Sequence, residues 1–117
     1  MTIIKSGLIQ MGLKGDTSMS PEQIRDLMLE AHGPLIDKAG EAGVQILCFQ
    51  EVFTQPYFCP SQDKRWYSAA EAIPNGHTTN LMCEYAKKYH MVIIVPIYEE
   101  AMPGVYYNTA AVIDADG

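Results

Sequence analysis

Apolar residues recur along the chain with two spacings, which separate helices from strands. Two stretches repeat apolar side chains every three or four positions and predict amphipathic helices: residues 20–39 and 78–90. Four shorter stretches rich in β-branched and aliphatic residues are typical of strands: residues 2–11, 44–49, 91–98 and 105–113. The order is therefore β-α-β-loop-α-β-β, with a long loop at residues 52–76. Right-handed crossovers place the first three strands parallel, and the fourth pairs with the third as an antiparallel hairpin. The pattern predicts an α/β fold with a mixed sheet.

Cap and turn residues set the limits of these elements. Ser20 and Gln23 occupy the N-cap and capping-box positions of the first helix, and Thr78 is the expected cap of the second. The Gly33-Pro34 pair falls inside the first helix and should kink or break it. Pro96 cannot donate to a strand ladder, so we expect it to mark the end of the third strand or an irregularity in it. Residues 99–104 are then expected to turn the chain.

The central strands are apolar on both faces. A strand of this kind must be covered on both sides. The two predicted helices can cover one face of the sheet readily. The other face then needs a second layer, which residues 1–117 do not supply.

Composition narrows the class of protein. The 117 residues suit one small domain or a piece of a larger one, and 48% are hydrophobic, which is enough for a packed core. The net charge of −6, without a run of Lys and Arg, argues against a nucleic-acid partner. No apolar stretch is long enough to span a bilayer. Three cysteines cannot all pair and no secretory signal is visible, so we expect a cytoplasmic protein.

The last residues, "AVIDADG", combine an apolar strand with a hairpin turn signal. A turn of this kind is expected to lead into another strand. We therefore expect residues 1–117 to be the amino-terminal portion of a longer domain, cut after the fourth strand.

One charged residue stands in an unusual place. Glu51 follows the apolar strand and precedes a loop rich in aromatic residues. Ligands of α/β folds bind beyond the carboxyl ends of parallel strands. Apolar neighbours would desolvate the carboxylate, which makes it a better proton acceptor and favours a general base. The alternative is an ordinary loop glutamate in water, and position alone does not separate the two.

The other reactive side chains give weaker signals. Cys59 lies in the long loop, but no helix N-terminus or histidine is near it in sequence, so a small apolar residue is the better interpretation. Cys48 lies in a strand and Cys83 in a helix, and both are expected in the core. None of the histidines has metal-ligand spacing with another ligand type: His32, His77 and His90.

Several loop aromatics are candidates for lining a pocket: Phe53, Tyr57, Phe58, Trp66 and Tyr67. For most of them, packing of the loop onto the domain is the simpler explanation. Phe53 and Tyr57, which are nearest to Glu51 in sequence, are kept as candidate substrate contacts.

The succession of motifs resembles the nitrilase superfamily. The segments that carry the resemblance follow one another from about Ile3 onward: "GLIQM", "ILCFQEVF", "PYFCPSQD", "AEAIPNGHTT", "AKKYHMVIIVPIYE" and "YYNTAAVIDADG". Each motif alone is weak, whereas the ordered set is specific, and it is most similar to the branch of β-ureidopropionases and N-carbamoyl amide hydrolases. His77 stands where the family usually has proline.

The resemblance implies a mechanism with a glutamate, a lysine and a cysteine. The cysteine attacks an amide or carbamoyl carbon, the glutamate takes its proton, and the lysine helps to hold the oxyanion. Glu51 matches the family's glutamate in the "FQE" motif. The lysine and the cysteine motifs have no match within residues 1–117, so these residues alone are expected to be inactive.

The resemblance also implies a fold and partners. The family fold is a four-layer αββα sandwich that commonly dimerises, so a homo-oligomer is expected for the full-length form. Neither a cofactor nor a metal is implied, and the substrate would be a small N-carbamoyl compound or linear amide. The alternatives are a non-catalytic α/β binding or assembly module, or a nitrilase or acyltransferase of the same superfamily.

Overall fold

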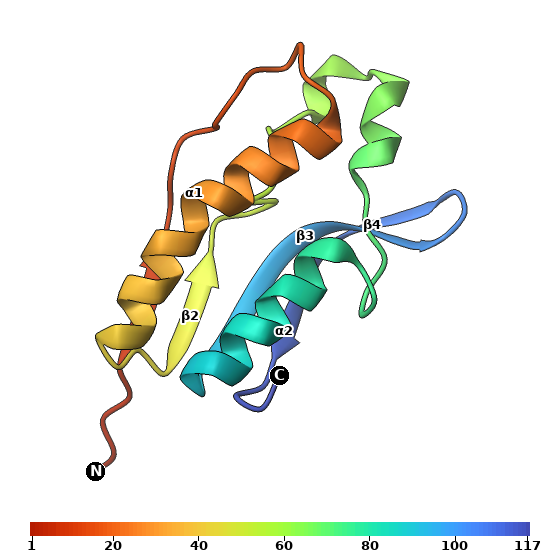
Figure 1. Ribbon diagram of the computed structural model, residues 1–117. Coiled ribbons are helices and arrows are strands. Elements are labelled where there is room, and N and C mark those ends of the chain that lie inside the picture. Colours follow the sequence, from red (N-terminus) through yellow and green to blue (C-terminus); the bar gives the residue numbers. More distant parts are fainter.

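The computed structural model describes residues 1–117 and contains a single four-stranded sheet with two long helices (Figure 1). The elements are, in order, β1 Ser6–Ile9, α1 Pro21–Glu41, β2 Ile46–Phe49, the 3₁₀ helices η1 Cys59–Ser61 and η2 Lys64–Ala69, α2 His77–Tyr89, β3 Val92–Met102 and β4 Val105–Ile113. The sheet order is β1-β2-β3-β4, parallel for the first two pairs and antiparallel for the last. The predicted element order and mixed sheet are confirmed.

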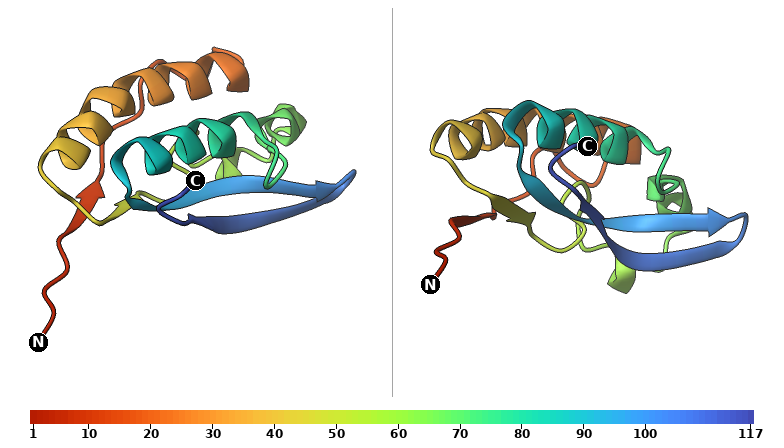
Figure 2. Two further views of the ribbon diagram at one scale, coloured as in Figure 1. Left: turned by 60° about the horizontal axis from the view of Figure 1, so that its bottom comes forward. Right: turned by 90° about the horizontal axis from the view of Figure 1, so that it is seen from below.

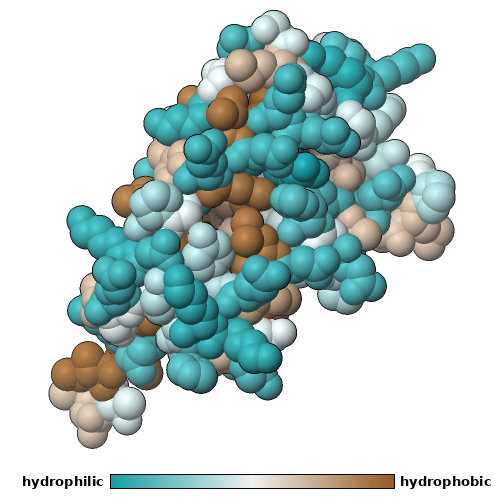
Figure 3. All heavy atoms as spheres, in the orientation of Figure 1, coloured by the Kyte–Doolittle hydropathy of each residue, from teal (hydrophilic) through white to brown (hydrophobic).

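Both helices lie on the same face of the sheet (Figure 2). The core lies between the two layers and is built from alternate strand residues together with the inner sides of the helices. Its fully buried members include Leu47, Ile93, Val95, Ile97, Ile36 and Met82. The outer side of the helix layer is largely hydrophilic, with hydrophobic atoms visible in a narrow zone between the polar ones (Figure 3). No helix is long and apolar enough to cross a membrane.

The opposite face of the sheet carries no helix. Its strand residues alternate with the core residues, and several are apolar and open to solvent: Leu8 is 83% exposed and Val112 is 69% exposed. This agrees with the expectation that the two helices cover only one face.

Helix α1 begins as its sequence predicts. The Ser20 hydroxyl accepts a hydrogen bond from the Gln23 backbone N–H, and the Gln23 side chain accepts one from the Ser20 N–H, which completes the capping box. The expected break at Gly33-Pro34 is wrong, because the helix continues to Glu41. Proline has no N–H, so the helix carbonyl four residues before Pro34 lacks its usual donor. Pro34 is exposed, which allows water to bind this carbonyl instead. Gly33 is buried, and the space above its Cα is occupied by the Tyr85 hydroxyl.

The hairpin differs from the sequence prediction. Strand β3 passes through Pro96 and ends at Met102, so residues 99–102 belong to the strand and the turn is confined to Pro103 and Gly104. Pro96 is tolerated because its backbone faces the side of β2, and β2 has already ended at Phe49. The Pro96 carbonyl instead accepts the N–H of Phe53 at 3.3 Å. The long strands place the β3-β4 ribbon beyond the end of β2.

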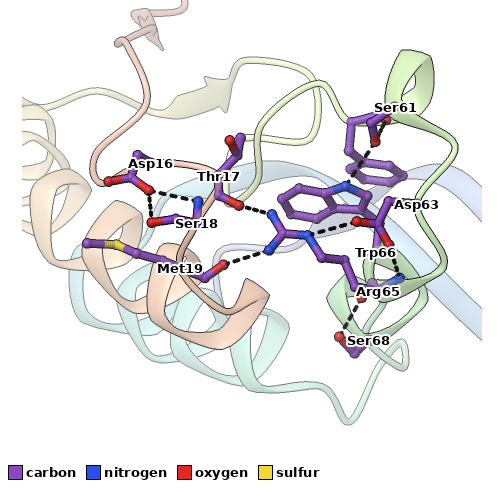
Figure 4. Close-up of polar contacts among 10 residues, drawn as sticks. Asp16, Thr17, Ser18, Met19, Ser61, Asp63, Arg65, Trp66 and Ser68 are labelled. Atoms are coloured by element: carbon purple, nitrogen blue, oxygen red, sulfur yellow. Dashed lines mark hydrogen bonds and ion pairs between the residues drawn. The ribbon is translucent and has the colours of Figure 1, made fainter.

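The long loop at residues 52–76 contains η1 and η2 and is fastened at several points, among them the side-chain amide of Gln55, which donates to the Pro21 carbonyl at 2.9 Å. Arg65, on η2, donates to the carbonyl oxygens of Thr17 and Met19, which ties this loop to the segment before α1 (Figure 4). Glu71 exchanges backbone hydrogen bonds with Tyr98 and Glu100 of β3. The loop is therefore held in place over the end of the sheet.

Helix α2 is capped differently from the prediction. The N-cap residue is Gly76, and Thr78 lies inside the helix. The Glu71 carboxylate accepts the Thr78 N–H at 2.8 Å and the Thr78 hydroxyl at 2.6 Å. A carboxylate at this position also complements the positive end of the helix dipole. The prediction that Thr78 caps the helix is wrong, because the Glu71 carboxylate, from outside the helix, binds a backbone N–H group at this end.

Candidate active site

Glu51 lies on a tight turn directly after β2. Strand β2 ends at Phe49, and residues 51–55 reverse the chain beside the middle of β3. The turn is held by the hydrogen bond from Gln55 N–H to the Val52 carbonyl at 3.0 Å and by the Phe53–Pro96 bond. Gln50, just before it, is fixed by two hydrogen bonds between its side-chain amide and the Met11 backbone, at 2.6 and 2.9 Å. The predicted position at the carboxyl end of a parallel strand is confirmed.

The residue after Glu51 has a strained backbone. Val52 has φ of 47°, in the left-handed region. A β-branched residue rarely adopts this conformation, since its Cβ approaches the following carbonyl oxygen. Strain of this kind persists only where the surrounding structure enforces it, and it is concentrated at functional sites.

Glu51 lines a cavity of about 350 Å³ on the helix-free side of the sheet. The lining also includes Val52, Pro56, Tyr57, Phe58, Cys59, Tyr98, Tyr106, Tyr107 and Asn108. The Glu51 Oε1 atom accepts a hydrogen bond from the Asn108 side-chain amide at 2.7 Å. Glu51 is exposed to solvent in residues 1–117, which differs from the desolvated carboxylate that we expected among aromatic neighbours.

Aromatic rings from the loop and the hairpin form the wall of this cavity. The Tyr98 ring lies 5.0 Å from the Phe58 ring and 5.4 Å from the Tyr106 ring, centroid to centroid. A second cavity of about 260 Å³ shares Phe58, Cys59 and Tyr98 with the first and extends it toward Trp66. Burial raises the pKa of Tyr98 above its ordinary value of 10.0. The Tyr98 hydroxyl is protonated at neutral pH, as any tyrosine with a pKa of 10 or more is, and it can act as a donor.

The two predicted substrate contacts lie in different places. Tyr57 is 74% exposed and lines the Glu51 cavity. Phe53 is fully buried on the helix side, where its ring stacks on Phe49 and meets the edge of His32. A fully buried side chain cannot touch a ligand in that cavity, so the geometry gives Phe53 no role as a substrate contact.

The cysteines and histidines are scattered. Cys59 is exposed and lines the Glu51 cavity, whereas Cys48 and Cys83 are half-buried. His32 is fully buried and its Nδ1 donates to the Met28 carbonyl at 2.7 Å, which leaves Nε2 without a partner. Burial lowers the pKa of His32 below 6.5, opposed by the Met28 hydrogen bond. No three acidic, histidine or cysteine side chains gather in a way that could hold a metal ion.

Two other carboxylates near the strand ends have different surroundings. Both oxygens of Glu71 are bound by Thr78, and Oε2 of Glu99 accepts the Thr109 hydroxyl at 2.6 Å. Glu51 has one oxygen, Oε2, without a hydrogen-bond partner in the chain, and Glu99 likewise has a free Oε1. What distinguishes Glu51 is the cavity described above, which neither Glu71 nor Glu99 lines.

The sequence patterns did not identify Asn108, Tyr98 and Tyr106 as members of this site. Asn108 pairs with Tyr98 and Tyr106 pairs with Glu100 in the β3-β4 register, so Asn108, Tyr98 and Tyr106 share one face of the sheet. Strand alternation combined with the hairpin register places these three together, whereas Tyr107 reaches the cavity from the other face.

Comparison with known proteins gives a consistent result. A family model described as carbon-nitrogen hydrolase matches residues 7–117. A β-ureidopropionase of Arabidopsis thaliana is 38% identical over 118 residues, covering 98% of this chain and 28% of that protein. An N-carbamoylputrescine amidase of Solanum lycopersicum is 37% identical over 83 residues, covering 71% of this chain and 27% of that protein.

A solved structure shows the same fold. The crystal structure of a carbon-nitrogen hydrolase from Helicobacter pylori G27 superposes on 97% of this chain and on 36% of the hydrolase chain, with a TM-score of 0.68 and 23% sequence identity. This chain spans only 28% of the length of the β-ureidopropionase and 27% of that of the N-carbamoylputrescine amidase.

Proposed function

This chain belongs to the carbon-nitrogen hydrolase family, and on that premise we propose that Glu51 is the general base of a hydrolase that cleaves C–N bonds in N-carbamoyl compounds or small linear amides. The observation that carries the proposal is the placement of the Glu51 carboxylate. It lines a cavity, one oxygen is held by Asn108, and the other has no partner.

The chemistry requires a nucleophile that loses a proton to this carboxylate. In the proposed reaction, Glu51 takes the proton of a cysteine thiol while the sulfur attacks the carbonyl carbon. The same proton is then given to the departing nitrogen as the C–N bond breaks, and water later releases the acyl or carbamoyl group from the sulfur. A lysine assists by holding the negative oxygen of the tetrahedral intermediate. We propose that this lysine and this cysteine come from residues outside 1–117.

The substrate class rests on the relatives. The two enzymes described above are named as a β-ureidopropionase and an N-carbamoylputrescine amidase, which supports an N-carbamoyl substrate. The aromatic wall around Glu51 suits a small ligand with an apolar part. The rival proposal is a binding or assembly module that has the fold without the reaction.

The test uses the complete product of the gene. Ammonia release is measured with an N-carbamoyl amine, an N-carbamoyl amino acid, a simple amide and a nitrile. Glu51→Gln should lower kcat by about two orders of magnitude, the usual scale for loss of a general base. Glu84→Gln is the matched control, because Glu84 is an exposed carboxylate on α2 away from the cavity. No turnover of any substrate, or full activity of Glu51→Gln, would contradict the proposal.

Cys59 requires its own control because it lines the same cavity. If Cys59→Ser abolishes covalent attachment of the substrate, the nucleophile lies inside residues 1–117, contrary to the proposal. If Cys59→Ser reacts normally, the nucleophile lies elsewhere, as proposed.

A further inference from the structure

We propose that Asn108 is the positioning residue of the catalytic base: its side-chain amide holds Oε1 of Glu51 and leaves Oε2 as the oxygen that takes the proton. This inference rests on the proposed function of Glu51. It adds a residue from a different part of the chain, 57 positions away in sequence.

The donor and acceptor of this contact follow from chemistry. An ionised carboxylate has lone pairs only, so the partner atom of the amide must be the Nδ2 group, which carries hydrogens. The Nδ2–Oε1 distance of 2.7 Å is short for an N–H···O bond, as expected where the acceptor is charged. Asn108 has no charge, so it fixes the carboxylate without neutralising it.

Asn108 lies on a regular strand, whereas Glu51 lies on a turn. Asn108 lies inside β4, paired with Tyr98 in a hairpin whose register is regular from Ile93 to Glu100. Glu51 instead lies on a turn next to the strained Val52. A side chain on a strand can orient one on a turn, and this arrangement defines the geometry of a site better than the turn could alone.

The neighbours of Asn108 make this contact specific. The next residue, Thr109, points to the other face, where its hydroxyl binds Glu99. Tyr98 and Tyr106 lie on the same face as Asn108 and form the wall of the cavity. The hairpin therefore places the Asn108 amide against the Glu51 carboxylate within a cavity lined by tyrosines.

Asn108→Ala should lower kcat by about one to two orders of magnitude, the scale of one hydrogen bond to a charged group, with a much smaller change in KM. Asn108→Asp should be at least as damaging, although Asp has the same shape, because it lacks the donor and brings a second negative charge. A purely structural role would tolerate the Asp variant. The double variant Glu51→Gln with Asn108→Ala should be no slower than Glu51→Gln alone.

Ala110→Ser is the matched control, because Ala110 lies on the same face of β4 as Asn108 but does not line the cavity, and serine is close to alanine in size. It should leave kcat unchanged. An Asn108→Asp variant with wild-type kcat, or additive losses in the double variant, would overturn the inference.

An NMR measurement separates this inference from the proposed function. In the ¹⁵N-labelled protein, Glu51→Gln should shift the side-chain amide signal of Asn108, whereas Glu84→Gln should not. A shift without any hydrolase activity would support the contact and reject the proposed reaction. Activity that depends on Glu51, with no shift of the Asn108 signal, would keep the reaction and reject the positioning role.

Discussion

Gly40 offers a sharp test of how the two helices pack. It lies in the last turn of α1 and faces the ring of Tyr89, the last residue of α2. A Cβ atom added at Gly40 would lie 2.3–2.6 Å from Cγ, Cδ1 and Cδ2 of Tyr89. Carbon atoms in contact are normally about 3.5–4.0 Å apart. The atoms that clash are at the near end of the ring, so the side chain cannot avoid the clash by a small rotation.

The expected loss of stability follows from two opposed effects. Overpacking costs about 1–3 kcal/mol, whereas replacing glycine by alanine inside a helix gains about 0.5–1 kcal/mol. Displacing the ring also breaks the hydrogen bond from the Tyr89 hydroxyl to Asp37. We therefore expect Gly40→Ala to lower the free energy of unfolding by about 1–2 kcal/mol.

Gly33→Ala is the matched control in the same helix. Its Cβ would meet only the Tyr85 hydroxyl, at 3.1 Å, and that group is the far end of a side chain that can move. The helix propensity gain should then remain, so this variant is expected to be neutral or slightly stabilised. Urea unfolding of the complete gene product, followed by circular dichroism, measures both. Equal stability of the two variants would refute the packing described for α1 and α2.

Three further predictions follow from burial. The pKa of His32 is lowered in the folded state, so the unfolded state binds more protons as the pH falls. The free energy of unfolding should therefore be highest above about pH 6.5 and decrease below it. His32→Phe should remove this decrease, as measured by urea titrations at different pH values. A decline that persists in His32→Phe would assign it to other groups. Phe53→Ala should cost about 3–5 kcal/mol of unfolding free energy, whereas Tyr57→Ala should change it by less than about 0.5 kcal/mol and instead raise KM; similar stability losses would show that their burial is misassigned. Residues 1–117 expressed alone should self-associate through the helix-free face, with light scattering as the readout; a sharp monomer near 13.0 kDa would contradict this.

Much of the fold follows from local sequence signals. The capping box at Ser20 and Gln23 fixes the start of α1, and the apolar pattern of residues 46–49 marks a covered central strand. The place of Glu51 after that strand is also a local feature, but position alone leaves its role open, and only the resemblance of the "FQE" motif favours a catalytic glutamate. The parallel arrangement then follows from the handedness of the crossovers.

The differences come from contacts between distant residues. Pro96 is predicted to mark the end of β3 or an irregularity in it, but the strand continues regularly through it. Strand β2 ends before this point, so no carbonyl of β2 lacks a donor because proline has no N–H. Thr78 loses its capping role to Glu71, which the loop brings from outside the helix. Asn108 joins the site only through the β3-β4 register. Phe53 is held in the core by its ring contacts with Phe49 and His32 and by the hydrogen bond of its N–H to the Pro96 carbonyl. These contacts involve residues outside the local patterns from which the predictions were made.

The most direct test of the central claim is the rate at which substrate attaches to the nucleophile. Intact-protein mass spectrometry after rapid quenching measures this step in the complete gene product, without interference from product release. If Glu51 takes the proton, Glu51→Gln should slow attachment of an N-carbamoyl substrate by about two orders of magnitude while its Kd changes by less than about twofold. Attachment at the wild-type rate in Glu51→Gln would contradict the claim.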